Sequence, residues 1–453
     1  MGALSRRLHG ERTPSPRWFY AYAPMSVAMG LSTPLIPLFM VVALHASLLD
    51  VGLLVFFTSL AAVPGAILWG RVSDRLHRRR AFVLLGLGSL AVTLPLMAWT
   101  REPAVYFAAN ALLGLLQAAG AATATVLIME SMHPRDWPRQ IGRFAQISGV
   151  AFVGGLLLGA VWLAVAPGPL GEQAALVGLF LVGAALSSAA VAVGALTLRE
   201  GHHRVDRLAA AAALAHLGHS IIERRHGFFV RFTMISGLSW KGLARSAGHP
   251  SGRFALGTGV LFTGFLVFNA PLPVFLLREA QLTHDLVFWV YMASAGLSAA
   301  LYAYAGRRCQ ARPPRGVLLR ASWSRVAVYP LFAVAVLALG PATPAALAAL
   351  LALNALAGAA WAFINVGGSV VASDLAEPEA RGQAIGLYNA AIGAGSIVGA
   401  AVGGLLAQSF PFLVVFAIAA AFIAAGALTV ATVPVPEPQA DVRAPAGAPA
   451  PHA

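Results

Sequence analysis

Charged side chains are scarce in this chain. Asp, Glu, Lys and Arg together make up 11% of its 453 residues, whereas a soluble domain contains about 25%. The stretches between the charges are apolar and many reach about 20 residues, the length of a helix that crosses a bilayer. Because lipid offers no partner to a backbone N–H or C=O group, such segments must be helical. The scarcity of charge therefore excludes a set of soluble domains and predicts an all-α membrane protein.

Alternating short strands of the kind that build a membrane barrel are also missing from the sequence. The apolar stretches instead predict twelve transmembrane helices. We place them at residues 18–42, 48–70, 80–100, 103–130, 142–166, 173–198, 254–277, 285–306, 317–340, 343–373, 382–407 and 410–434.

Cysteine and lysine each occur once, as Cys309 and Lys241. A single cysteine excludes a disulfide framework. The net charge of +14 is carried almost entirely by arginine. If the N-terminus is cytoplasmic, all Lys and Arg except Arg101 and Arg278 lie in cytoplasmic tails, loops and adjoining helix ends. This asymmetry follows the positive-inside rule. It predicts a multi-pass protein of the inner (cytoplasmic) cell membrane, with both termini in the cytoplasm and no nucleic-acid partner.

The spans form two blocks of six, which we assign to an N-terminal bundle at 18–198 and a C-terminal bundle at 253–434. Residues 1–17 form a basic cytoplasmic tail, and residues 435–453, rich in Pro and Ala, a disordered cytoplasmic tail. Residues 199–252 form a long cytoplasmic loop that contains six histidines. Metal binding by these histidines and simple solvation both fit, but no tight ligand set accompanies them, so we expect no metal or cofactor.

An internal repeat links the two blocks. When residues 110–159 are placed on residues 354–403, 12 of 50 positions are identical without a gap. The pairs include Asn110 with Asn354 and Pro134 with Pro378. Two parallel six-helix repeats predict a pseudo-twofold axis along the membrane normal and a binding site between the halves.

The loop after the second span reads Gly70-Arg71-Val72-Ser73-Asp74-Arg75-Leu76-His77-Arg78-Arg79-Arg80. It resembles the signature loop of the major facilitator superfamily, in which a glycine is followed by a small residue, Asp-Arg and a basic cluster. The family usually has glycine where this chain has His77. The twelve spans, the repeat and the long central loop agree with this resemblance, which covers nearly the whole chain.

The resemblance implies a conformational latch at the cytoplasmic side. Gly70 would allow close helix approach, and Asp74 would face the N-terminus of span 11, where the helix dipole favours an anion. The arginines of this loop would pair with Glu130, the acid at the cytoplasmic end of span 4. In the second half of the chain, Asp374 and Arg381 would supply a weaker version of this contact. The remaining latch residues are Arg75, Arg78, Arg79, Glu130, Asp374 and Arg381. The alternative for each arginine is that it only sets the topology.

Ionisable residues within the spans are few. Asp50 and Asp285 each open a helix, where capping and proton coupling are the alternatives. Arg320 and Arg325 enter span 9 from its cytoplasmic end, and we expect both to snorkel to the membrane surface.

The resemblance also implies that spans 1, 4, 7 and 10 line the cavity. Polar and aromatic residues near their midpoints are the candidate substrate-binding residues, and tightening of helix contacts is their alternative role. They are Ser32, Thr33, Gln117, Asn269, Trp361 and Asn365. A cavity without fixed charge would suit a neutral or amphipathic solute.

The sequence as a whole favours a secondary transporter that moves a small solute by alternating access (a rocker-switch), with efflux as one direction open to it and a proton as one coupling ion. The alternative is a membrane protein of the same fold that acts as a sensor or assembly partner. The spans lack a nucleophile or paired carboxylates, so we do not expect an enzyme. We expect a monomer.

Overall fold

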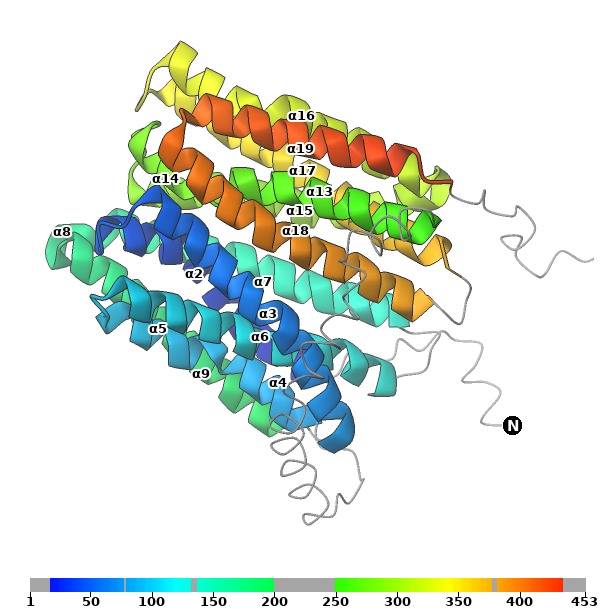
Figure 1. The fold of residues 1–453 in the computed structure, drawn as a ribbon. Helices are drawn as coiled ribbons and strands as arrows, with labels where there is room; N and C mark the ends of the chain where they lie inside the picture. Colours follow the sequence, from blue (N-terminus) through cyan, green and yellow to red (C-terminus); the bar gives the residue numbers. More distant parts are fainter. Residues whose placement is uncertain (1–16, 77–78, 132–136, 199–248, 377–380, 435–453) are drawn as a thin grey trace, which may run out of the picture.

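The computed structural model describes residues 17–76, 79–131, 137–198, 249–376 and 381–434 (Figure 1). Within these residues the chain is helical, and twelve helical segments are long and apolar enough to cross a membrane, from Arg17–Val42 to Phe412–Ala431. The expected all-α membrane fold is therefore confirmed. The predicted tails and most of the predicted central loop, with all its histidines except His249, lie outside the described residues.

The first six spans form the N-terminal bundle. Its elements are η1 (Arg17–Ala21), α2 (Tyr22–Val42), α3 (Leu48–Leu76), α4 (Arg79–Leu87), α5 (Ser89–Trp99), α6 (Pro103–Ser131), α7 (Trp137–Val165), α8 (Pro167–Leu170) and α9 (Glu172–Thr197). The last six spans form the C-terminal bundle. Its elements are α13 (Pro250–Asn269), α14 (Leu272–Arg278), α15 (His284–Ala311), α16 (Pro314–Leu339), α17 (Pro344–Asp374), α18 (Arg381–Ser409) and α19 (Phe412–Ala431).

Two of the predicted spans are interrupted. The third is divided at Gly88 into α4 and α5. The seventh is divided between Asn269 and Leu272 into α13 and α14. Pro271 and Pro273 cause the second break, because proline has no N–H to continue the helical hydrogen bonds and its ring clashes with the preceding turn.

The two bundles repeat the same packing. Asn110 of α6 donates through Nδ2 to the Leu54 carbonyl of α3 at 3.0 Å, and Asn354 of α17 donates to the Val290 carbonyl of α15 at 2.7 Å. Each asparagine is buried. The central helices correspond as well, since α2 packs on α7 and α9 as α13 packs on α18 and α19. The internal repeat is therefore a structural repeat.

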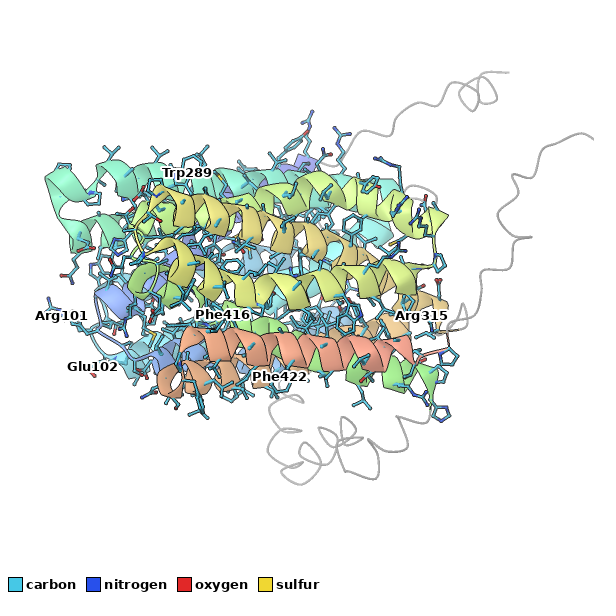
Figure 2. All side chains as sticks on the ribbon, turned by 90° about the horizontal axis from the view of Figure 1, so that it is seen from above. Arg101, Glu102, Trp289, Arg315, Phe416 and Phe422 are labelled. Carbon is cyan, nitrogen blue, oxygen red and sulfur yellow. The ribbon has the colours of Figure 1, made fainter. Side chains whose placement is uncertain are left out.

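The helix ends define two ends of the molecule. Most described arginines lie at the end of the molecule where α3 ends and α18 begins, which we call the basic end. They include Arg79, Arg80 and Arg315. The opposite end, the far end, carries Arg101 and Glu102 (Figure 2). The spans run between these two ends, as a membrane-crossing bundle requires.

The bundles contact each other closely in the far half. Gly52 of α3 lies against Gly404 of α18, with no room for a Cβ on either residue, and Gly159 of α7 lies against the ring of Phe288 in α15. Towards the basic end α3 and α18 separate (Figure 1), and an added Cβ at Gly386 of α18 would touch nothing within 4 Å. The molecule is thus closed between the bundles at the far end.

Candidate functional site

A cavity of about 310 Å³ lies where α7 of the N-terminal bundle faces the C-terminal bundle. This volume is at the lower end of the range of small-molecule pockets, roughly 300–1,000 Å³. Its walls come from α7, α13, α14, α15 and α17, and they carry no acidic or basic side chain. The lining residues are Gly149, Phe152, Asn269, Leu272, Tyr291, Ser294, Ala295, Ser298, Ala299, Tyr302, Asn354 and Trp361.

One face of α15 supplies most of the polar wall. Tyr291, Ser294, Ser298 and Tyr302 are three or four residues apart, so they lie on the same side of the helix. The Ser298 hydroxyl is buried and has no hydrogen-bond partner among the residues that the structure describes. We did not predict this face, because we expected the cavity to be lined only by spans 1, 4, 7 and 10. The helical spacing of four hydroxyl groups within one span was the signal that could have revealed it.

Asn269 reaches the cavity from the last turn of α13, directly before the proline break. Its Nδ2 group donates to the Phe265 carbonyl at 2.8 Å. Because Pro273 has no N–H, the main-chain carbonyl of Asn269 loses the donor that an unbroken helix would provide. A discontinuous helix of this kind is where transporters commonly place ligand contacts.

Trp361 of α17 forms the aromatic part of the wall. Its ring packs edge-on against Phe262 and Phe265 of α13, with ring centroids 5.8 Å apart in both pairs. Trp361 is half-buried and lines the cavity. The two phenylalanines therefore fix the orientation of an indole that offers a flat apolar face and one N–H donor.

Arg325 lies directly behind this aromatic wall. It is 11 residues beyond Pro314, about 16 Å along α16 by helix geometry, and only 5% exposed. Its guanidinium stands 4.0 Å from the Phe265 ring centroid and 5.6 Å from that of Trp361. Our expectation that Arg325 snorkels to the surface is therefore wrong. The side chain points into the bundle, because hydrogen-bond acceptors and aromatic rings there replace water.

The hydrogen bonds of Arg325 reach uncharged groups. Nη1 donates to the Tyr329 hydroxyl and Nη2 to the Ala357 carbonyl, both at 2.7 Å. The arginine is connected to the cavity wall through Trp361, whose ring centroid is 5.6 Å from the guanidinium and which lines the cavity. Arg320 is five positions before Arg325 in α16. It is exposed, and its Nε group donates to the Gly316 carbonyl of its own helix.

The structure brings two of the six predicted substrate-binding residues to this cavity, Asn269 and Trp361. Asn365 is not among the lining residues, but it contacts one of them, since its Nδ2 group donates to the Tyr302 hydroxyl at 3.3 Å. Ser32 and Thr33 both donate to the Met29 carbonyl of their own helix, and neither is among the lining residues.

Gln117 is half-buried in α6 and is likewise not among the lining residues, although it is the repeat equivalent of Trp361.

Most side chains of the expected latch lie outside the described residues. This applies to Gly70, Asp74, Arg75, Arg78, Glu130 and Arg381. Arg79 is described and donates to the Ser73 hydroxyl of α3 at 2.9 Å. Asp374 is exposed as the last residue of α17.

Asp50 has a capping role at the start of α3. Its Oδ2 accepts from the Ser47 N–H at 2.8 Å and from the Ser47 hydroxyl at 2.7 Å, while the Asp50 N–H donates to the Ser47 oxygen at 3.2 Å. This is a reciprocal capping box, with Ser47 as the cap. The capping interpretation of Asp50 is confirmed, although the cap residue itself is three positions earlier.

A histidine and a glutamate link the bundles at the far end. Nδ1 of His284, the first residue of α15, is 3.1 Å from Oε1 of Glu172, the first residue of α9. Within the described ranges no group of three or more His, Cys, Asp or Glu side chains is arranged to hold a metal ion.

Comparison with known proteins gives the following matches. The sequence model of the family described as Major Facilitator Superfamily matches this chain over residues 18–332 and 254–452. No curated protein matches the chain. Among solved structures, a mutant form of the nucleoside transporter NupG is similar with 15% identity and a TM-score of 0.69, over 92% of this chain and 98% of that one.

Two POT family structures are similar as well. A POT family transporter in complex with a thioalcohol-conjugated peptide has 9% identity and a TM-score of 0.70, over 92% of this chain and 94% of that one. An auto-inhibited POT family peptide transporter has 17% identity and a TM-score of 0.65, over 92% and 96%. At these identities the likeness shows the fold.

Proposed function

The chain belongs to the major facilitator superfamily, and from that premise we propose that it carries a small solute across the inner membrane by alternating access. The cavity between α7 and α15 carries this proposal, because it lies where the two bundles meet and combines polar groups with an aromatic wall. Rocking of one bundle against the other would expose this cavity to each side in turn.

The inter-bundle contacts support an inward-facing state. Gly52 against Gly404 and Glu172 against His284 hold the far end together. The excess of arginine at the basic end favours the cytoplasm for that end and for both termini. The cavity in this conformation would then exchange with the cytoplasm.

The latch belongs to the opposite half of the cycle. Asp74, Arg75, Arg78, Arg79 and Glu130 would hold the basic end closed when the far end opens, with Gly70 allowing close approach of the helices. Asp374 and Arg381 would make a lesser contact in the second half. The charge of Asp74 near a helix N-terminus is the physical basis of this proposal.

A cysteine reporter in the cavity tests alternating access. Cys309 is buried at the basic end of α15 and is replaced by alanine, and Ser294→Cys then places one thiol in the cavity wall. A membrane-impermeant thiol reagent is applied from each side of oriented vesicles. We expect labelling from both sides, with rates that change in opposite directions when a transported solute is added.

The same vesicles provide the control. Ser409→Cys, at the exposed far end of α18, should label from the far side only and at a constant rate. Labelling of the Ser294→Cys thiol from one side only, whatever solute is present, would favour a sensor or assembly partner of the same fold.

A further inference from the structure

We propose that the cavity between α7 and α15 takes a small organic anion with a flat apolar part. The hydroxyl groups of α15 would contact its charged end, Trp361 would cover its apolar part, and Arg325 would supply the positive potential. This inference names the substrate class of the proposed transport and rests on that function.

The charge of Arg325 is the first argument. A guanidinium group keeps its proton in proteins. Throughout the described part of the chain it has no carboxylate partner, since its two hydrogen bonds reach the Tyr329 hydroxyl and the Ala357 carbonyl. Its buried Nε has no acceptor. A charge inside a membrane protein is costly unless another charge offsets it, so an anion close by would be stabilised.

The position of Arg325 gives the size of the effect. Trp361 lines the cavity, and its ring centroid is 5.6 Å from the guanidinium. The α15 hydroxyls would hold the carboxylate across the cavity from the indole, at a separation from the guanidinium on the order of 10 Å. At an effective dielectric constant of about 20, this attraction favours an anion over a neutral analogue by on the order of tenfold.

The cavity wall supplies the direct contacts. Ser298 is 6% exposed, lines the cavity, and its hydroxyl has no partner. A buried polar group without a partner is unfavourable, and rotation of the Ser298 side chain toward the cavity would let a ligand oxygen provide the missing acceptor. Tyr291, Ser294 and Tyr302 place three more hydroxyls on the same helix face. Because no acidic residue lines the cavity, nothing there would repel an anion.

The apolar side of the cavity fits the rest of such a ligand. Phe152 of α7, Leu272 of α14 and the Trp361 indole face the same space as the hydroxyls. A planar group between these side chains would remove apolar surface from water, and stacking on the indole would add to this. The wall is therefore divided into a donor face and an apolar face.

Three probes of one shape and different charge test the proposal. Binding of phenylacetate, phenylacetamide and phenethylamine is measured by calorimetry on the full-length protein in lipid nanodiscs. We expect phenylacetate to bind about tenfold more tightly than the neutral amide, and phenethylamine to bind most weakly. Equal or weaker binding of phenylacetate, or no binding of any probe, overturns the proposal.

Substitutions separate the electrostatic role from a structural one. Arg325→Met should abolish the preference for the acid and leave binding of phenylacetamide within about twofold. Arg320→Met removes a positive charge from the same helix and should change neither value. An unchanged preference in Arg325→Met would show that this arginine only joins α16 to its aromatic neighbours.

Arg325→Lys and Ser298→Ala keep the test decisive if Arg325→Met does not fold. The lysine variant retains the charge and should retain the order of the three probes, whereas Ser298→Ala should weaken phenylacetate several-fold more than phenethylamine. Loss of the order in the lysine variant, or equal weakening of both probes by Ser298→Ala, contradicts the proposal.

Flux into proteoliposomes distinguishes the two proposals. If phenylacetate binds with the expected preference but is not moved, the anion site stands and the transport function fails. If phenylacetamide and phenethylamine are moved as readily as phenylacetate, transport stands and the anion preference fails.

Discussion

At the scale of single residues, Trp361 and Gln117 show how far the repeat extends. They occupy equivalent positions in α17 and α6, but only Trp361 is among the residues that line the cavity. The difference arises because α7 of the N-terminal bundle meets α15 of the C-terminal bundle at this cavity. The ligand site is therefore less symmetric than the fold.

This asymmetry leads to a prediction about affinity. Trp361→Ala should weaken phenylacetate binding by about fivefold or more, since an aromatic contact contributes roughly 1 kcal/mol beyond the area it buries. Gln117→Ala serves as the matched control at the equivalent position and should leave the dissociation constant unchanged. Calorimetry on both variants measures this difference, and equal effects would place the site on the symmetry axis instead.

Arg325 changes the view of the cavity reached from the sequence. The absence of charged lining residues agreed with a neutral or amphipathic solute. A cation 5.6 Å behind the indole makes the potential positive without adding a charge to the wall, because the low dielectric of the bundle transmits it.

At the scale of helices, the start of α3 rests on the Ser47–Asp50 capping box. Ser47→Ala should lower the free energy of unfolding by about 1 kcal/mol, the usual effect of losing a helix cap. Ser409→Ala is the control, because the Ser409 hydroxyl is exposed and bonds only to Leu405 of its own helix. Thermal unfolding of the purified variants measures both changes.

Asp50 itself should not couple transport to protons. Its carboxylate is engaged in the cap, so Asp50→Asn should leave the pH dependence of flux unchanged while weakening α3. A lost pH dependence in this variant would restore the proton-coupling interpretation of Asp50.

The broken seventh span also belongs to this scale. Pro271 and Pro273 end α13 at Asn269 and start α14 in a new direction. Prolines in α2, at Pro34 and Pro37, leave that helix continuous. The same residue type therefore breaks one central helix and not its counterpart, and Asn269 at the end of the broken one lines the cavity.

At the scale of the whole molecule, contacts at the two ends should act in opposite directions. Glu172 pairs with His284 across the bundles at the far end, and Asp74 is proposed to hold the basic end. Glu172→Gln should increase labelling of the Ser294→Cys thiol from the far side, by up to about fivefold, because a pair with one solvent-exposed partner contributes about 1 kcal/mol. Asp74→Asn should decrease it and impair flux.

Glu102→Gln is the control for this prediction, since Glu102 is an exposed acid at the same end and should not alter labelling. Wild-type flux and labelling in Asp74→Asn would remove the latch from the mechanism. An unchanged far-side rate in Glu172→Gln would show that the glycine contacts alone, such as Gly52 on Gly404, close the far end.

The number of spans, the division into two bundles and the repeat could all be predicted from the order of amino acids alone. The spans depend on the transfer of stretches of about 20 apolar residues into lipid, and the repeat depends on the similarity of two segments. Both can be read from the order of residues in the chain. Asn110 and Asn354 illustrate this, because their equivalence was visible in the sequence and their hydrogen bonds repeat in the structure.

Three features became visible only in the folded molecule: the helix faces that line the cavity, the burial of Arg325, and the contact of Glu172 with His284. Each of these depends on partners far away in sequence, such as Phe265 and Ala357 around Arg325. The sequence around a basic residue in a span does not reveal whether its side chain snorkels to the membrane surface or points into the bundle. The neighbouring helices decide between the two, because they supply or withhold the groups that replace water.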